Sequence, residues 1–380
     1  MDFYRKILIF IIICITFYLL YRLIISRIKY KYTYSNSKSL ESFASLNNYY
    51  NETVKSISTN NKNLVTVSSF RIQNMTRKNG ILTDAPMKLK QFCIKSSYCS
   101  AFTGKECSVD MILYVLSRGC RFLDLEIYYV NGELVVSYSN NYLTPSVNTI
   151  PLGNVLSIIY DNAFGSVSPN KKDPLFLQFR VKYLPSEEHK NVLNTTLSMI
   201  YDSLASSIQL NIHNRFMNTL EKDVSELLFS DIMGTTLIVM DTSQYNYSFA
   251  NLSSKLAKVV HIRTNSKSLS KSTFSDIEKM KKYTLTTQDD GVTTDATILQ
   301  EITPTTLDEG FEYTMPDNYD GVSMLLDYGF NITPMQFWNN GSHLSRYEDI
   351  FNKGKSGILN ISDAISYAYQ LRAIPKIIFP

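Results

Sequence analysis

Cysteine and histidine, the side chains that most often supply nucleophiles, proton carriers and metal ligands, are placed unfavourably for each of these uses. Four of the five cysteines crowd into one stretch, at Cys93, Cys99, Cys107 and Cys120, without the C-x-x-C spacing of a zinc or redox site. They form no recognisable disulfide framework, and no histidine pairs with them in the sequence. We therefore expect buried, unreactive thiols rather than a catalytic cysteine. The histidines are His189, His213, His261 and His343.

The elements around these residues follow an alternating pattern after residue 84. Short apolar runs predict strands, and amphipathic runs predict helices. We expect strands at 92–94, 122–128, 134–138, 175–179, 236–240 and 258–262, helices at 109–116, 155–160, 191–208 and 274–282, and further apolar segments at 298–302, 322–326 and 332–337. Alternation over roughly 270 residues favours one parallel α/β domain, and its length suits a (β/α)8 TIM-type barrel.

Four segments in the first half of this region are more specific. They are SSYCSAFTG at 96–104, SRGCRFLDLE at 117–126, ELVVSY at 133–138 and PLFLQFR at 174–180. In the same order they resemble S-S-H-N-T-Y-L-T-G, R-G-C-R-x-x-E-L-D, x-P-V-V-Y-H and P-V-I-L-S-L-E of the X region of the phosphoinositide-specific phospholipase C family. Later segments resemble the strand G-K-I-L-L-K and parts of the Y region, at 234–239, 274–276, 318–319, 332–337 and 347–357.

The resemblance covers residues 85–362 and implies a phospholipase C-like barrel with its site at the carboxyl ends of the strands. The two catalytic histidines of the family, however, fall on Tyr98 and Tyr138. Cleaving a phosphodiester through a cyclic intermediate needs a base and an acid, and histidine serves because its pKa lies near the operating pH. Tyrosine ionises near a pKa of about 10. We therefore interpret Tyr98 and Tyr138 as packing residues rather than as an unusual acid–base pair.

The calcium ligands of the family are altered as well. Its asparagine ligand falls on Cys99, its E-L-D pair becomes Asp124 and Glu126, and the glutamate of the fourth segment becomes Arg180. Calcium takes roughly six to eight oxygen ligands, so a guanidinium both removes ligands and repels the ion. We expect no cofactor and a lost calcium site. In its place we expect a buried ion pair of Arg180 with Asp124 and Glu126, rather than a retained metal or ligand site.

The positions that bind a phosphorylated headgroup in the family also carry different residues in this sequence. Basic residues of the G-K-I-L-L-K-G-K strand fall on Thr235, Val239 and Asp241, and a phosphate-binding arginine falls on Glu301. An acid at such a position repels phosphate, so the residues that would bind a substrate stay unassigned.

The function that we expect is therefore non-catalytic, namely a phospholipase C-like barrel that acts as a binding or structural protein. The alternative is a calcium-independent phosphodiesterase that acts on inositol lipids with a rearranged acid–base pair. Metal-independent bacterial relatives also place an arginine near the calcium position, so Arg180 by itself is compatible with either interpretation.

The N-terminus predicts a single-pass membrane anchor. Residues 7–21 read ILIFIIICITFYLLY, and residues 23–25 continue the run beyond Arg22. A span needs about 20 apolar residues, so contact with the bilayer is expected through residues 7–26. No small-residue cleavage site follows, which favours an uncleaved anchor over a signal peptide. The expected organisation is an anchor at 1–28, a polar stalk at 29–84, the barrel at 85–362 and a tail at 363–380.

Charge and composition bear on location and partners. Cations cluster beyond the apolar run, which favours a cytosolic domain, although eight N-x-[ST] sequons favour the opposite side. A net charge of +4, with no basic stripe interleaved with aromatics, predicts no nucleic-acid partner. Low Gly and Trp with abundant Tyr are typical of A+T-rich codon usage. The composition therefore leads us to expect a virion membrane, with a protein partner that the sequence does not identify.

Overall fold

The computed structural model describes residues 73–78, 81–139, 145–182, 190–212, 223–242, 253–272, 287–288, 291–292, 299–302 and 318–373. All of them belong to the second of two compact units, residues 61–380. The apolar run at 7–26, predicted to be a membrane anchor, lies outside the described residues. Among the described helices, none is long and apolar enough to cross a bilayer.

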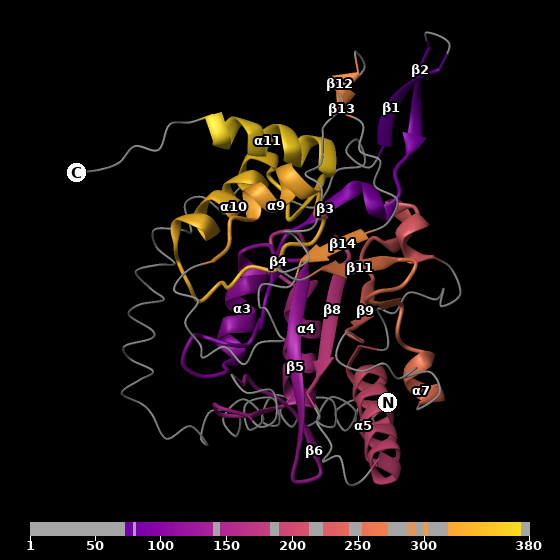
Figure 1. The fold of residues 1–380 in the computed structure, drawn as a ribbon, viewed down its shortest axis with the longest axis vertical. Helices are drawn as coiled ribbons and strands as arrows, with labels where there is room; N and C mark the ends of the chain where they lie inside the picture. Colours follow the sequence, from indigo (N-terminus) through magenta and orange to yellow (C-terminus); the bar gives the residue numbers. More distant parts are fainter. Residues whose placement is uncertain are drawn as a thin grey trace, which may run out of the picture. The chain divides into compact units, whose positions relative to one another are not determined.

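The strands alternate with helices along the chain, as the sequence predicts (Figure 1). The strands are β1 Gln73–Lys78, β2 Ile81–Pro86, β3 Phe92–Ile94, β4 Ser96–Ser97, β5 Phe122–Val130, β6 Glu133–Val136, β7 Ile150–Pro151, β8 Leu175–Val181, β9 Thr236–Met240, β10 Ile262–Arg263, β11 Leu269–Ser272, β12 Thr287–Gln288, β13 Gly291–Val292, β14 Leu299–Ile302 and β15 Ile358–Asn360. The expected strand at 258–262 is shorter than predicted, and the expected helix at 274–282 lies outside the described residues.

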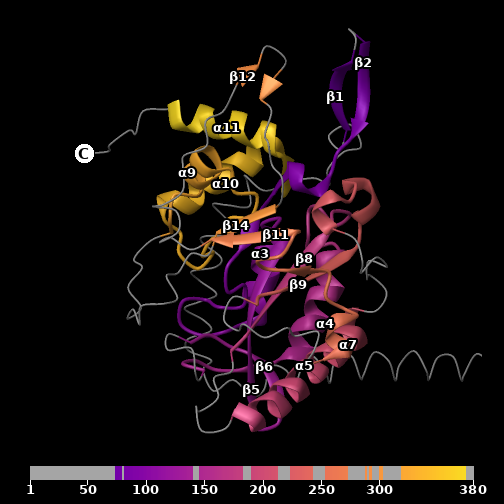
Figure 2. The same cartoon turned by 45° about the vertical axis from the view of Figure 1, so that its right-hand side comes forward.

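The helices fall into two groups. In the first, α3 Val109–Ser117, α4 Leu152–Ala163, α5 Lys190–Ile212 and α7 Ser254–Ala257 contact one another in that order. In the second, α9 Gly321–Tyr328, α10 Ser342–Gly354 and α11 Ile361–Ala373 pack together near one end of the molecule in both views (Figure 2). Short 3-10 helices are η2 Leu89–Gln91, η5 Val224–Glu226 and η6 Phe229–Ile232. Helix α11 occupies much of the stretch expected to be a tail.

The largest sheet has the order β10-β9-β8-β5-β6-β7, with β4 also beside β5. The pairs β10–β9, β9–β8, β8–β5 and β5–β4 are parallel, while β6 pairs antiparallel with both β5 and β7. Parallel neighbours joined through helices confirm the α/β class.

Strand pairing continues beyond both edges of this sheet. On one side, Ile94 and Ser97 bridge in parallel to Ile332 and Met335. On the other, Thr264 bridges to the start of β11, which pairs in parallel with β14. Within the described residues, no pairing joins β14 to residues 332–335, so the expected closed (β/α)8 barrel is not confirmed. Most of the chain that would supply the closure, 273–317, lies outside the description.

The interior of the sheet is layered from apolar to polar. A buried cluster gathers side chains from the strands and from η5 and η6, including Phe92, Phe122, Phe176, Val239 and Ile332. Alternate residues of a strand share a face, so Phe122 and Phe176 are followed on the same face by the polar residues of β5 and β8. The apolar layer therefore supports a polar layer nearer the carboxyl ends of the strands.

Candidate functional site

The polar layer is positioned by the register of two parallel strands. Every residue of β8 is buried, and in β5 only the last two are partly exposed. Asp124 lies opposite Gln178, and Glu126 lies opposite Arg180. With a period of two, these four side chains share one face of the sheet. Two carboxylates and a guanidinium are thus brought together, as predicted from the sequence.

Arg180 holds both carboxylates with the full fork of its guanidinium. Its Nε donates to Asp124 Oδ1 at 2.7 Å, and one terminal nitrogen donates to Asp124 Oδ2, also at 2.7 Å. The other terminal nitrogen donates to Glu126 Oε1 at 2.8 Å. All three residues are no more than 3% exposed. The ion pair that we expected is therefore present, and its bidentate geometry is the strongest that arginine forms with a carboxylate.

The other lone pairs of the two carboxylates are also used. Asp124 accepts the backbone N–H of Cys99 at 2.9 Å and the Gln178 amide at 3.1 Å. Glu126 Oε2 accepts the Tyr128 hydroxyl at 2.8 Å and a backbone N–H at 3.3 Å. Each of the four carboxylate oxygens therefore has at least one protein donor.

The ionisation of this cluster follows from its charges. Burial by itself raises the pKa of Asp124, but the Arg180 guanidinium and the hydrogen bonds outweigh it and hold that pKa below its usual value. Burial would lower the pKa of Arg180, yet its acidic neighbours, Asp124 first, raise it well above the ordinary value. Both groups therefore stay charged near neutral pH.

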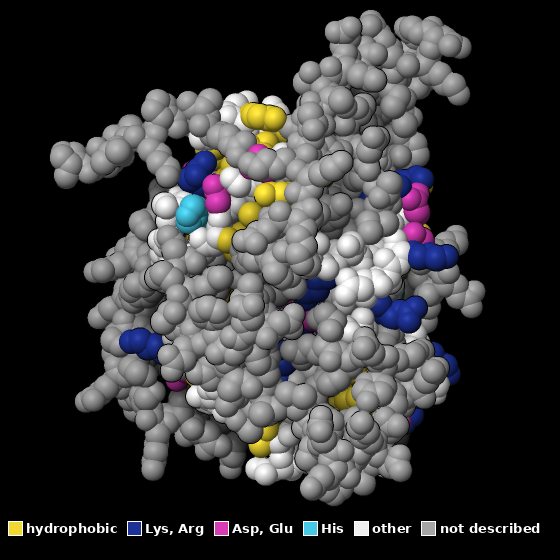
Figure 3. All heavy atoms as spheres, in the orientation of Figure 1, with side chains coloured by type: hydrophobic (Ala, Val, Ile, Leu, Met, Phe, Trp, Pro, Cys, Tyr) yellow, Lys and Arg dark blue, Asp and Glu magenta, His cyan; other side chains and the backbone are white. Residues whose placement is uncertain are grey.

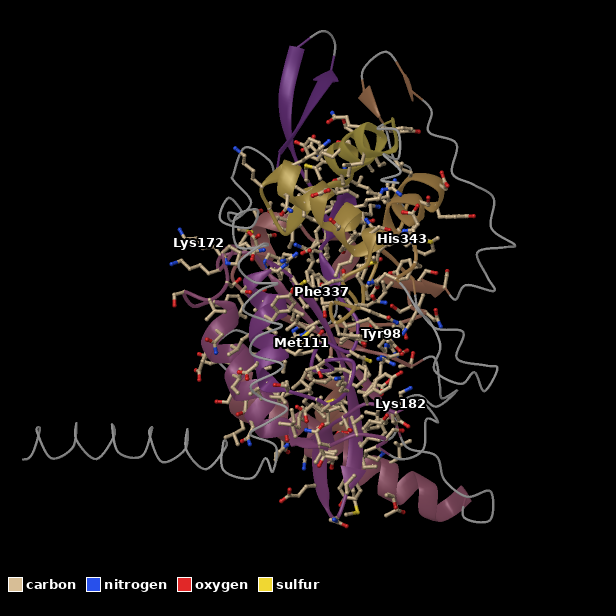
Figure 4. The ribbon with its side chains drawn as sticks, turned by 90° about the vertical axis from the view of Figure 1, so that its left-hand side faces the viewer. Tyr98, Met111, Lys172, Lys182, Phe337 and His343 are labelled. Atoms are coloured by element: carbon tan, nitrogen blue, oxygen red, sulfur yellow. The ribbon has the colours of Figure 1, made fainter. Side chains whose placement is uncertain are left out.

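Tyr98 lies over the guanidinium instead of facing an open site. The Arg180 guanidinium carbon is 4.5 Å from the centroid of the Tyr98 ring, which is the arrangement of a cation–π contact. The Tyr98 side chain is only 5% exposed, and burial raises the pKa of its hydroxyl well above the ordinary value. The phenol therefore stays protonated near neutral pH. Figure 4 labels both Tyr98 and Lys182, and in that view the two lie on the side of the molecule away from Lys172.

Tyr138 belongs to an aromatic cluster. Its ring stacks on Phe102 with centroids 4.1 Å apart and an interplanar angle of 11°. Trp338 meets Phe102 edge-on at 5.0 Å and lies 6.4 Å from Tyr98. Gly104 makes room for this indole, because a Cβ there would come within 3.1 Å of Trp338 Cδ1. The four aromatic rings thus pack as one group, which we call the aromatic cluster: Tyr98, Phe102, Tyr138 and Trp338.

A second ion pair adjoins the first and was not predicted. Lys271 donates to Asp241 Oδ2 at 2.7 Å, and Lys182 lies 3.5 Å from Glu126 Oε1. The charge of Lys271 also contributes to lowering the pKa of Asp124, so the Lys271–Asp241 pair interacts electrostatically with the Arg180 cluster. Three cations thus face three carboxylates, and their formal charges balance. The alternate spacing of Gln178, Arg180 and Lys182, the last of which directly follows β8, is the sequence pattern that could have indicated this lysine.

The remaining predicted positions lie elsewhere. His261 accepts the backbone N–H of Ile238 at 2.9 Å and so supports the pairing of two strands, and His343 lies on α10. His189 and His213 lie outside the described residues. Val239 belongs to the apolar layer. Glu301 lies on β14, where the backbone alone is described.

The four cysteines of the first half are buried, as expected. Burial raises the pKa of Cys93 and of Cys120 to about 12, and it raises that of Cys99 well above the ordinary value. Reactivity requires a thiolate, so these thiols are poor nucleophiles at neutral pH.

Cys99 has a strained backbone, with φ of 41°. Residues other than Gly, Asn and Asp lose about 1–2 kcal/mol in this left-handed region. We expect Cys99→Asn to raise the free energy of unfolding by about 0.5–1 kcal/mol, because asparagine tolerates the conformation. Its amide oxygen would also replace the sulfur, which accepts a hydrogen bond from Arg180 at 3.0 Å. Urea denaturation measures the change. Cys99→Ala, which keeps the strain and loses the acceptor, is the control and should not stabilise. Equal stabilities for the two variants would contradict the strain argument.

The R-G-C-R part of the second segment has structural uses. Arg121 is fully buried and donates to the backbone carbonyls of Ala163 at 2.8 Å and Pro174 at 3.1 Å, which ties the start of β5 to the end of α4. Gly357 packs against the same loop, because a Cβ there would come 2.1 Å from the carbonyl oxygen of Gly119.

Arg118 takes part in a buried cluster with a helix of the second group. The Lys95 ammonium lies 2.8 Å from Glu348 Oε1 and donates to the Arg118 carbonyl at 2.6 Å. Arg118 Nε donates to the same carboxylate at 2.9 Å. Two buried cations therefore share one carboxylate, on α10.

The polar layer thus lies on neighbouring parallel strands of a mixed α/β fold. Residues 85–225 match the family model described as the X domain of phosphatidylinositol-specific phospholipase C. This match agrees with the resemblance found in the sequence.

Solved structures support the same fold. One is "Crystal Structure of L. pealei PLC21", with a TM-score of 0.52 and 16% identity, in which the match covers 78% of this chain and 39% of that chain. Another is "Crystal Structure of S. officinalis PLC21", with a TM-score of 0.50, 15% identity, and coverage of 77% and 38%. The chain thus spans about two fifths of their length, and at such identities the likeness shows the fold alone. No curated protein matches the sequence.

Proposed function

We propose that this chain is a catalytically inactive phospholipase C-like domain that serves as a binding or structural element at a membrane. The observation that carries the proposal is the placement of Arg180 between Asp124 and Glu126, with every oxygen of both carboxylates already accepting a hydrogen bond. A site whose charged groups satisfy one another has little left to offer a reacting phosphodiester.

The acid–base groups point to the same conclusion. The two positions that align with the histidines of the family are the buried tyrosines of the aromatic cluster. A general base must lose its proton near the operating pH, and the raised pKa of Tyr98 opposes this. Tyr138 is stacked flat on Phe102, which serves packing.

Calcium, which the family resemblance implies, does not fit these residues as they are arranged. The ion needs roughly six to eight oxygens and a net negative site. Here the guanidinium of Arg180 lies within 2.8 Å of oxygens from both carboxylates, and Lys182 adds a second cation nearby. We propose that Arg180 supplies the positive charge that the ion provides in the family, so the domain needs no metal.

The proposal includes a closed barrel and a membrane tether. Pairing that runs past both edges of the main sheet supports closure through the chain between β14 and residues 332–335. The apolar run at 7–26 supports an uncleaved anchor, with the domain on the cytosolic side. Composition adds a virion membrane as the setting, in which the domain would link the bilayer to a protein shell.

The test is a hydrolysis assay on the full-length chain in mixed micelles of phosphatidylinositol and its phosphates, with calcium or with a chelator. We expect no release of inositol phosphate above that from the heat-denatured protein. A family enzyme assayed alongside controls for substrate quality. Turnover that is lost in Tyr98→Phe or Tyr138→Phe would replace the proposal with the calcium-independent phosphodiesterase. Turnover that survives both changes would show that the site lies elsewhere.

A further inference from the structure

Helix α5 buries one face and exposes the other. Leu197, Leu204 and Ile208, which recur at helical spacing, are fully buried, and the helix contacts α4, α7 and β6. On the opposite side of the helix, the side chains of Met199 and Leu210 are 54% and 76% exposed. Among the described residues only one other large apolar side chain is exposed, on α11. The exposed apolar surface of the described residues is therefore concentrated on α5.

The outward side of α5 is also uncharged. Five exposed residues line one stripe of the helix, because they follow one another at spacings of three or four residues. We call this stripe the α5 face: Thr195, Met199, Ser203, Ser206 and Leu210. The outward side of a surface helix ordinarily carries charged residues. Depletion of charged residues is instead the compositional mark of the centre of a protein interface.

Charged groups lie beside the α5 face rather than on it. Within residues 195–212, Asp202 is the one charged residue, and its carboxylate turns to α7, where it accepts from Ser253 and lies 3.6 Å from Lys255. Lys258, just after α7, is exposed as well. Figure 3 shows Lys and Arg side chains along the right-hand edge of the view, on the side where Figure 1 places α7. The lack of charge is thus a property of the α5 face and not of its surroundings.

The order of residues on the α5 face is the same in both directions along the helix. Met199 and Leu210 are an outer pair, Ser203 and Ser206 are an inner pair, and both pairs are centred between residues 204 and 205. If two such helices lie antiparallel across that point, Met199 of one meets Leu210 of the other, and Ser203 meets Ser206. The apolar side chains then cover each other, and the small serines let the helices approach closely. A two-fold dimer requires a patch that is complementary to itself, whereas binding to a different protein does not.

We propose that the α5 face binds the same face of a second copy of this chain, with the two helices antiparallel. The helix has 23 residues and is therefore about 35 Å long, which gives the contact several turns on each side of its centre. A single helix pair buries less than the roughly 800 Å² per partner of a standard interface, so we expect a reversible dimer. The inference goes beyond the proposed function and stands whether or not the domain is catalytically inactive.

Disulfide trapping on the full-length chain in detergent micelles tests the pairing. Met199→Cys and Leu210→Cys are prepared as separate proteins, and each is mildly oxidised with copper phenanthroline, alone or mixed with the other. We expect the mixture to give a covalent dimer linked from 199 to 210, at roughly tenfold or more the yield of either protein alone. In the proposed dimer two copies of the same position are about 16 Å apart along the helix axis, whereas a disulfide needs Cα atoms within about 7 Å. Mass spectrometry identifies the linked peptides, and the four described native cysteines are buried.

A charge placed on the α5 face provides the matched control. Ser203→Lys, added to both cysteine variants, should lower the yield of the mixed dimer roughly tenfold, because two like charges then meet near the centre of the contact. Ser345→Lys adds the same charge at an exposed position of α10 and should leave the yield unchanged. A mixed yield no higher than that of each protein alone, or linkage of 199 to 199, would overturn the pairing. Linkage of either introduced cysteine to Cys14 would also overturn it, since the N-terminal run would then lie on the α5 face. Equal loss with both lysine variants would refute the proposal as well, because association would then respond to charge alone.

Discussion

Arg180→Ala is expected to lower the free energy of unfolding by about 3–5 kcal/mol, the largest effect that we anticipate for a single side chain of the site. The change leaves the carboxyl groups of Asp124 and Glu126 almost fully buried and without the guanidinium that they share. Lys182, 3.5 Å from Glu126, compensates only one of the two carboxylates. Chemical denaturation followed by far-ultraviolet circular dichroism measures the loss.

Arg346→Ala is the matched control, since it also removes an ion-paired arginine. Arg346 lies 3.6 Å from Asp320, and both side chains are 29% exposed. Such a partly exposed pair contributes about 1 kcal/mol or less. Neutralising the stranded acids with Asp124→Asn and Glu126→Gln in the Arg180→Ala background should recover part of the loss, because the unpaired charges are removed. If Arg180→Ala leaves the free energy of unfolding unchanged, the proposal that Arg180 supplies the positive charge between Asp124 and Glu126 is refuted.

Arg180→Glu restores the residue of the family and tests the calcium argument directly. Without calcium it should be less stable than Arg180→Ala, because three carboxylates then repel one another. Added calcium should return part of that stability, as ligand binding to the folded state does, while the wild type should not respond. If calcium stabilises the wild type as strongly as it stabilises Arg180→Glu, the ion must bind to this site even though the Arg180 guanidinium is present.

The sequence predicted the first half of the domain better than the second. In the first half, the strands at 122–130 and 175–181 lie where apolar runs and family segments coincide, and the helix at 109–117 lies between two such segments. Between 273 and 317, the expected helix at 274–282 lies outside the described residues, whereas the apolar segment expected at 298–302 coincides with β14. Helix α11 was missed because it follows the last family segment, although its buried residues Ile361, Ala364, Ile365 and Ala368 have helical spacing that the sequence offered.

The site shows which parts of a structure a pattern can predict. The contact of Arg180 with Asp124 and Glu126 followed from aligned positions on neighbouring strands together with the rule that buried charges are paired. The stacking of Tyr138 on Phe102, and of Tyr98 on the guanidinium, depends on side-chain directions at the ends of loops, which no spacing encodes. The pair of Lys271 with Asp241 needed the register of strands that are not adjacent in the chain.

The second large effect is expected in the pH dependence of stability, which should trace to Lys95. Its ammonium is fully buried, and two cations share the carboxylate of Glu348. Burial, together with the charge of Arg118, lowers the pKa of Lys95 to about 7, against 10.5 in the ordinary state. Between these values the unfolded chain binds a proton that the folded chain does not. The free energy of unfolding should therefore rise with pH, by at most about 1.4 kcal/mol per pH unit from this residue.

Lys95→Met isolates this contribution, because it keeps an unbranched apolar side chain and leaves Arg118 and Glu348 as a balanced pair. Denaturation of both proteins from pH 7 to 9 should show that the free energy of unfolding rises by about 1–3 kcal/mol more in the wild type than in the variant. The comparison cancels the thiols, because the raised pKa values of Cys93 and Cys120 lower the stability of both proteins alike as unfolded cysteine ionises, near a pKa of about 8.5. Below pH 7, Lys95 is protonated in both the folded and the unfolded chain. The difference in unfolding free energy between the wild type and the variant should therefore not change with pH in that range. If the difference in unfolding free energy between the two proteins stays constant from pH 7 to 9, Lys95 remains protonated in the folded chain. It would then be a charged partner of Glu348 throughout this range.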